Sequence, residues 1–224
     1  MVAWLQGGPF LEVSFIIKFN DEKKEVIKAI LKKLTNLHHQ IEVVDTNLVE
    51  MLESFDKGYP YDEEDPHSVY KHSMHVNLYV SVAGRRKSTL QIEQVSSSAL
   101  LINFWFFGSE FDAPEWGQIG IKGEDLSDFK NFLIDLFYNF KFKIGGVAIE
   151  EDVLGLYDCD EARPNECYCF EYIKPQQLLK NTPYFIDILW NEGYGKLGDT
   201  IPYYHKRIND SGLLISISNS YSEF

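Results

Sequence analysis

The spacing of apolar residues divides the first part of the chain into an alternating strand and an amphipathic helix. In residues 11–19 apolar side chains occupy nearly every second position, and this period of two predicts a half-buried β-strand. Between Val26 and Leu37 apolar residues recur every three or four positions, with lysines mostly between them. This spacing predicts a helix with Ile30 and Leu34 at the centre of its buried stripe.

Alternation returns further along the chain and predicts a group of neighbouring strands. Residues 74–82 alternate, the polar residues 83–87 predict a hairpin turn, and a return strand follows through Leu90 and Ile92. Residues 100–107 are apolar at odd and even positions alike, as in a strand that is covered on both faces. Because the turns between these strands are short, antiparallel pairing is favoured.

The remaining periodic segments complete an α+β pattern. A second long helix is predicted after Asp125, since Phe129, Leu133 and Phe137 share one face of it. Shorter apolar segments predict a helix at 48–55 and strands at 41–44, 144–149, 167–173 and 213–217. We therefore expect one α+β domain over residues 1–224, with a mainly antiparallel sheet and two longer amphipathic helices packed on it. A division into two lobes near residue 98 is the alternative.

The net charge of the chain limits the classes of partner that it is expected to bind. The formal net charge is −13, with 34 acidic against 21 basic residues, whereas nucleic acids and anionic membranes attract concentrated positive charge. The most apolar run, residues 99–107, is about half the roughly 20 residues that a membrane-spanning helix needs. The first residues show no secretory signal. We expect a cytoplasmic protein that binds neither nucleic acid nor membrane; acidity that serves only solubility is the alternative.

The cysteines and histidines predict no cofactor. Cys159, Cys167 and Cys169 are an odd number of thiols without the two close pairs of a structural zinc site. The six histidines include no H-E-x-x-H spacing. We therefore assign no metal ligand, no disulfide and no catalytic residue from these patterns.

The acidic residues are concentrated in three blocks, at residues 42–66, 108–128 and 150–171. These blocks hold 23 of the 34 acidic residues and only three basic ones. Such segregation predicts a surface for a basic protein partner, because complementary charge speeds encounter and selects among partners. Solvated loops without a partner are the alternative. The partner-binding residues that we predict, with aromatic anchors beside them, are Asp62, Glu63, Glu64, Asp65, Glu110, Asp112, Glu115 and Trp116.

The same residues also permit an enzymatic alternative. A glycosidase uses two carboxylates that flank the scissile bond, often above an aromatic platform. Glu110 and Asp112 lie close to Trp116 in the sequence and supply these side-chain types. A glycosidase-like hydrolase that uses loop carboxylates is therefore the runner-up to a non-enzymatic protein-binding module. A structural or scaffold protein is a third class that the sequence leaves open.

A stretch in the middle of the chain resembles a known group of proteins. It comprises the aromatic run Asn-Phe-Trp-Phe-Phe-Gly at 103–108, Asp112, Glu-Trp-Gly at 115–117, the phenylalanine-rich helix and residues 145–152. Taken together, these sequence features resemble those of immunity proteins of bacterial polymorphic toxin systems. The resemblance covers only this part of the chain and transfers no individual binding residue. It implies a small, acidic, cytosolic α+β protein that neutralises a toxin by binding it.

Overall fold

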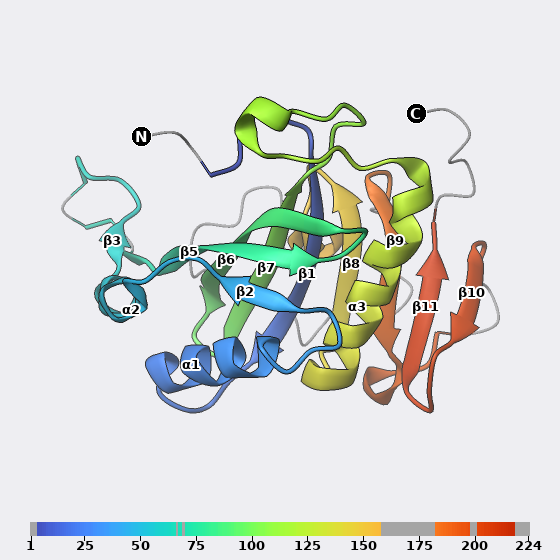
Figure 1. Ribbon diagram of the computed structural model, residues 1–224. Helices are drawn as coiled ribbons and strands as arrows, with labels where there is room; N and C mark the ends of the chain where they lie inside the picture. Colours follow the sequence, from blue (N-terminus) through green and yellow to red (C-terminus); the bar gives the residue numbers. More distant parts are fainter. Residues whose placement is uncertain (1–3, 66, 69, 158–181, 198–200, 218–224) are drawn as a thin grey trace.

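The computed structural model describes residues 4–65, 67–68, 70–157, 182–197 and 201–217 (Figure 1). The predicted strand at 167–173 and all three cysteines lie outside these residues. The expectation of free thiols without zinc therefore stays a prediction.

Nine strands form one antiparallel sheet, in the order β10-β11-β9-β8-β1-β7-β6-β5-β2. The strands are β1 (Phe10–Lys18), β2 (Ile41–Val43), β5 (Ser73–Ser81), β6 (Arg85–Ser96), β7 (Ala99–Phe107), β8 (Ile144–Ile149), β9 (Phe185–Asn191), β10 (Tyr204–Arg207) and β11 (Gly212–Ser216). The strands β3 (Tyr59–Pro60) and β4 (Tyr70–Lys71) form a separate small hairpin. Because β1 pairs with β7 on one side and β8 on the other, it joins the two halves of the chain in one sheet.

Three helices accompany this sheet, so the predicted α+β class with a mainly antiparallel sheet is confirmed. They are α1 (Lys23–Leu34), α2 (Leu48–Lys57) and α3 (Leu126–Phe140). The helix residues expected at the centre of the buried stripes, Ile30, Leu34, Leu133 and Phe137, are buried. They share one core with alternate residues of the sheet, such as Phe15. Helix α1 ends at Leu34, before the last residue of its stripe, Leu37, and α3 ends at Phe140, before Lys141, which adopts a left-handed backbone conformation.

The opposite face of the sheet, here called the second face, has a different composition. Toward β8, β9 and β11 it carries a smaller apolar cluster that includes Leu101 and Trp190 and packs against the turn η3 (Val153–Tyr157). On β1 and β7, Glu12, Asn103 and Trp105 occupy the positions that alternate with the core residues. The sheet is therefore covered by helices on one face and is mixed, polar and apolar, on the other.

The β5–β6 hairpin differs from the expected polar turn at 83–87. Strand β6 already begins at Arg85, and Arg86 is buried. Figure 1 shows β5 and β2 crossing the view while β1 and β11 run steeply, so the sheet is strongly twisted. This twist carries the hairpin across to the start of α3, where Arg86 finds its hydrogen-bond partners.

Candidate functional site

The first predicted acidic segment, Asp62 to Asp65, forms the exposed loop of the β3–β4 hairpin. Two of its carboxylates stabilise the loop itself, because Asp62 accepts a hydrogen bond from the backbone N–H of Glu64 at 2.9 Å and Asp65 accepts one from His67 at 2.8 Å. The Glu63 and Glu64 carboxylates have no hydrogen bond or ion pair within the described part of the chain. These two charges are therefore available to a partner.

Exposed aromatic side chains surround this loop. Tyr59, Tyr61 and Tyr70 belong to the hairpin or adjoin it, and Tyr61 is 63 % exposed. Large aromatic side chains next to charged groups are the anchors that protein interfaces favour. The β3–β4 hairpin thus combines exposed negative charge with exposed aromatic side chains, as binding surfaces do.

The second predicted segment lies in the loop between β7 and α3, residues 108–122. Glu110, Glu115 and Trp116 are exposed as expected, and the neighbouring Phe111 is 79 % exposed. Asp112 has a different role, since its Oδ1 accepts a hydrogen bond from the Gly120 N–H at 3.0 Å and closes the loop. Sequence reasoning missed Phe111, although an apolar residue between two acidic ones was its signal.

Buried contacts hold the 108–122 loop in place. The Arg86 guanidinium is 4 % exposed and donates to the carbonyls of Ile119 and Gly120 at 2.7 and 2.8 Å. It also donates to the Asp125 carboxylate at 2.9 Å. The Lys87 ammonium donates to the Trp116 carbonyl at 2.5 Å. The loop is therefore fixed to the sheet and to the start of α3 before any partner arrives.

The two acidic segments do not form one continuous patch. Figure 1 places the β3–β4 hairpin at the far left of the molecule, beyond α2, and the 108–122 loop at the top, above β1 and β7. The third acidic block begins at Glu150, at the end of β8, and its larger part, from residue 158 on, lies outside the described residues. A partner that touches both predicted segments must span the distance between them.

A group of carboxylates that the sequence did not single out lies on the second face. It contains Glu12 of β1, Glu93 of β6, and Glu151 and Asp152 in the turn after β8, and we call it the carboxylate cluster. The pKa of Asp152 is raised to about 7, chiefly by burial and in addition by the nearby charges of the other three carboxylates. The pKa of Glu12 is raised as well, chiefly by burial. Asp152 and Glu12 therefore gain protons more readily than a carboxyl group in water does.

Polar and aromatic residues of β1 and β7 surround the carboxylate cluster. The Asn103 side-chain amide donates to the Glu12 carboxylate at 2.5 Å, while its own Oδ1 is buried and has no partner within the described residues. The Ser14 hydroxyl accepts a hydrogen bond from the Val153 N–H at 2.8 Å and holds the turn after β8 against β1. Trp105 pairs with Glu12 across the strands. The sequence signal was slight: one polar residue, Asn103, inside an apolar run.

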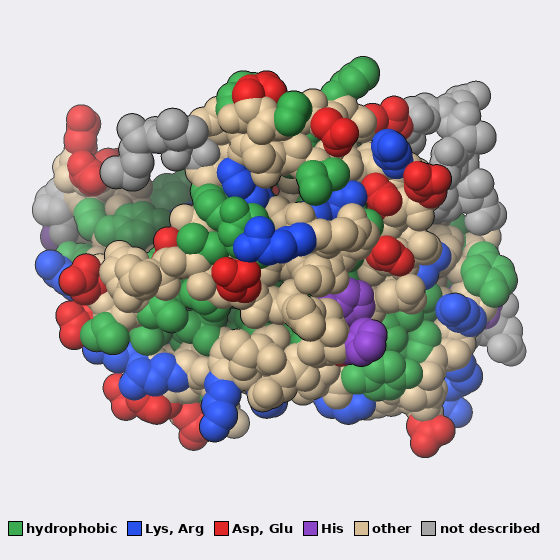
Figure 2. Space-filling view, viewed as in Figure 1, with side chains coloured by type: hydrophobic (Ala, Val, Ile, Leu, Met, Phe, Trp, Pro, Cys, Tyr) green, Lys and Arg blue, Asp and Glu red, His purple; other side chains and the backbone are tan. Residues whose placement is uncertain are grey.

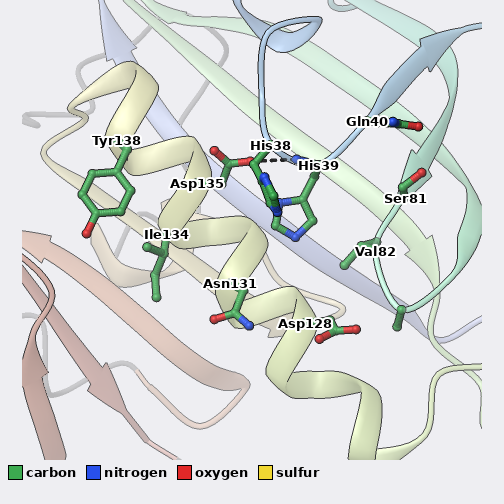
Figure 3. A pocket seen from close by; sticks show the side chains of 11 residues that line it. His38, His39, Gln40, Ser81, Val82, Asp128, Asn131, Ile134, Asp135 and Tyr138 are labelled. Atoms are coloured by element: carbon green, nitrogen blue, oxygen red, sulfur yellow. Dashed lines mark hydrogen bonds and ion pairs between the residues drawn. The ribbon is translucent and has the colours of Figure 1, made fainter.

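A hollow of about 660 Å³ opens on the helix side of the sheet (Figure 3). One wall is the segment after α1, with His38 and His39, and the tip of the β5–β6 hairpin continues this wall, because the Ser81 N–H donates to the Gln40 carbonyl. The base is the exposed side of α3, which carries Asp128, Asn131 and Asp135. The sequence assigned no role to these residues, because the hollow exists only where three segments far apart in the chain meet.

The hollow and the carboxylate cluster offer no evident metal site. The described residues contain no group of three or more histidine, cysteine, aspartate or glutamate side chains arranged to hold a metal ion. Within the same residues no helix is long and apolar enough to cross a membrane. Comparison with protein families, with curated proteins and with solved structures found no match for this chain. The function must therefore be inferred from the surfaces described above.

Proposed function

We propose that this chain is a non-enzymatic protein-binding module that captures a basic partner, and that it acts as an immunity protein that neutralises a toxin. The observation that carries the proposal is the 79 % exposure of Phe111 in an acidic loop that buried contacts hold rigid. A rigid loop loses little conformational entropy on binding, so its apolar and charged side chains act at lower cost. Exposed anchors of this kind are typical of binding surfaces.

The exposed charges support the same proposal. Glu110 and Glu115 flank Phe111 and Trp116, and Glu63 and Glu64 lie at the tip of the β3–β4 hairpin. Exposed carboxylates raise the rate of encounter with a basic protein more than they raise affinity, and salt screens this effect. The aromatic anchors act after encounter, by slowing dissociation. The association rate therefore reports the exposed carboxylates, and the dissociation rate reports the exposed aromatic side chains.

The test is a binding assay with the product of the neighbouring gene as the first candidate partner, at two salt concentrations. We expect Glu110→Lys/Glu115→Lys to slow association at low salt, and Phe111→Ala or Trp116→Ala to speed dissociation. The control with the same change of charge is Asp21→Lys/Glu22→Lys, at two exposed residues outside the acidic blocks. Equal association rates for the Glu110/Glu115 variant and the control would contradict the assignment of this surface.

A second candidate function is favoured by the carboxylate cluster. A carboxylic acid whose pKa is about 7, as for Asp152, is suited to general acid catalysis near neutral pH. Glu12 and the ring of Trp105 lie on the same face of the sheet, so a glycosidase-like hydrolase would use them rather than the predicted Glu110 and Asp112. Turnover of a chromogenic glycoside that Asp152→Asn abolishes without unfolding the protein would favour this function over the first.

A further inference from the structure

The hollow beside α3 is built around an aspartate whose hydrogen bonds are already used. Asp135 Oδ2 accepts from the backbone N–H of His39 and lies 3.0 Å from His39 Nδ1. Its Oδ1 accepts from the Asn139 amide at 3.2 Å. The side chains of His39 and Asp135 are each 13 % exposed, and the His39 ring meets Phe132 edge to face. This network fastens the segment after α1 to α3 and gives the hollow a fixed wall.

Asp128 differs from Asp135 in its surroundings. It is exposed, and it forms no hydrogen bond or ion pair with any residue that the structure describes. Residues 128, 131 and 135 lie three, four or seven positions apart, so they share one face of α3. Figure 3 shows Asp128 and Asn131 along the base of the hollow, below the two histidine rings. The hollow therefore contains a carboxylate that no described residue binds directly, although the charge of the Arg86 guanidinium acts on it from nearby.

The rest of the lining suits a long side chain with a polar end. Val82 and Ala83 on the hairpin and Ile134 on α3 supply apolar surface. Asn131 and Ser81 supply hydrogen-bonding groups near it. Arginine combines an apolar stem with a planar cation that binds carboxylates through two hydrogen bonds. A divalent metal ion fits less well, because the described residues offer no cluster of three ligands here.

The hollow also continues the acidic surface assigned to the partner. Glu110, Glu115 and Glu124 are exposed in the same acidic block that ends at Asp128. Figure 2 shows acidic side chains from the top of the molecule down to the two histidines, with a few basic ones between them. A basic partner held at the 108–122 loop therefore faces further negative charge as far as the hollow.

We propose that the hollow receives an arginine side chain of the basic partner, with its guanidinium on Asp128 and its stem against Ala83 and Ile134. This inference rests on the proposed function and names the residue type that the partner contributes. The histidines act as walls of the site and take no part in binding the charge. Asp128 is the residue that recognises the guanidinium.

The experiment uses arginine amide as the probe, with citrulline amide, whose side chain has nearly the same shape but no charge, as the comparison. Backbone amide resonances of the full chain are followed by NMR as each compound is added. We expect saturable shifts for residues of the hollow with arginine amide and none with citrulline amide. Asp128→Asn is expected to weaken binding roughly tenfold, as the loss of a charged hydrogen bond does. Glu53→Gln, an exposed acidic residue on α2, is the matched control and should change nothing.

Equal shifts with both probes, or unchanged affinity in Asp128→Asn, overturn the inference. The binding assay with the neighbouring-gene product distinguishes a failure of the arginine site from a failure of the proposed function. One outcome overturns the arginine site alone. In it the partner binds wild type and Asp128→Asn with equal affinity, while high salt and the Glu110/Glu115 variant both weaken binding. If binding of the neighbouring-gene product responds neither to salt nor to the Glu110/Glu115 variant, the proposed function fails as well.

Discussion

The acidic residues of the exposed loops and those of the carboxylate cluster carry the same functional group in opposite surroundings. Glu63, Glu64, Glu110 and Glu115 project into water, where charge is well solvated. Asp152 is half-buried among other carboxylates, and its pKa is raised to about 7. Water stabilises the first group as anions, while burial and mutual repulsion favour protons on the second. Charge therefore costs stability at the sheet, whereas at the loops it is free to serve the encounter with a partner that we propose.

The largest effect is expected where a carboxylate is placed in the apolar core. Phe137 is buried at the centre of the α3 stripe, and Ile30 holds the same place in α1. Phe137→Asp or Ile30→Asp should abolish soluble expression, because an unpaired carboxylate there costs several kcal/mol out of a total stability of about 5–15 kcal/mol. Soluble yield and thermal melting measure this. Melting like that of the wild type would mean that the stripe is not the buried face.

The next largest effect on stability is expected for Arg86, whose buried guanidinium forms an ion pair with the partly buried Asp125 carboxylate. Arg86→Met removes the charged donor of the Asp125 carboxylate, which retains the Lys122 N–H, and a donor of the Ile119 and Gly120 carbonyls. Removal of one partner of such a pair costs about 3–5 kcal/mol, measured by urea unfolding. Arg85→Met is the control, since its ion pair with Glu42 is exposed and should contribute little to stability. Equal losses for the two variants would contradict the role assigned to Arg86.

A smaller effect, with a distinct pH dependence, is expected for Asp152. Its pKa rises from 3.8 in the unfolded chain to about 7 in the folded one, so the folded state binds the proton more tightly. The stability of the wild type should therefore fall as pH rises from about 4 to 7, by roughly 1.4 kcal/mol for each unit of the pKa difference. Asp152→Asn removes this cost and should be more stable than the wild type at pH 8.

Urea unfolding at pH 5 and pH 8 measures the effect of Asp152→Asn. Asparagine retains an oxygen that accepts from the Leu154 N–H, so the local turn is preserved. A weaker slope with pH should remain, because burial also raises the pKa of Glu12. An identical pH dependence for wild type and Asp152→Asn would show that this carboxyl is not desolvated in solution.

The smallest effect on stability is expected at the loop carboxylates. Glu63→Lys/Glu64→Lys should change the free energy of unfolding by about 0.5 kcal/mol or less, because neither side chain has a described partner. The same variant should slow association with a basic partner, and added salt should reduce the difference from the wild type. Stopped-flow association at two salt concentrations measures this. A stability loss of several kcal/mol would show that these charges are part of the fold.

The presence and type of β1, α1 and α3 could be predicted from the sequence because their patterns are local, although α1 ends three residues before the stripe does. A period of two or of 3.6 residues is visible within about ten residues, and burial of Ile30 and Phe137 follows from it. The position of Arg86 could not be predicted, since polar residues in a hairpin usually face water. Its partners lie 33 to 39 residues further along the chain. The hairpin turn expected at 83–87 is present but shorter than predicted, because residues 85–87 already belong to β6.

The sequence by itself determined the α+β class, the antiparallel pairing and the long helices, because apolar periodicity specifies which side of each element avoids water. It also determined the acidic character and the segregation of the charge. Only the tertiary structure decided that β1 lies between β7 and β8, which brings Glu12 close to Asp152. It likewise decided that His39 meets Asp135 and that Asp128 faces a hollow. These pairings depend on the twist of the sheet and on contacts across about a hundred residues, which local periodicity does not encode.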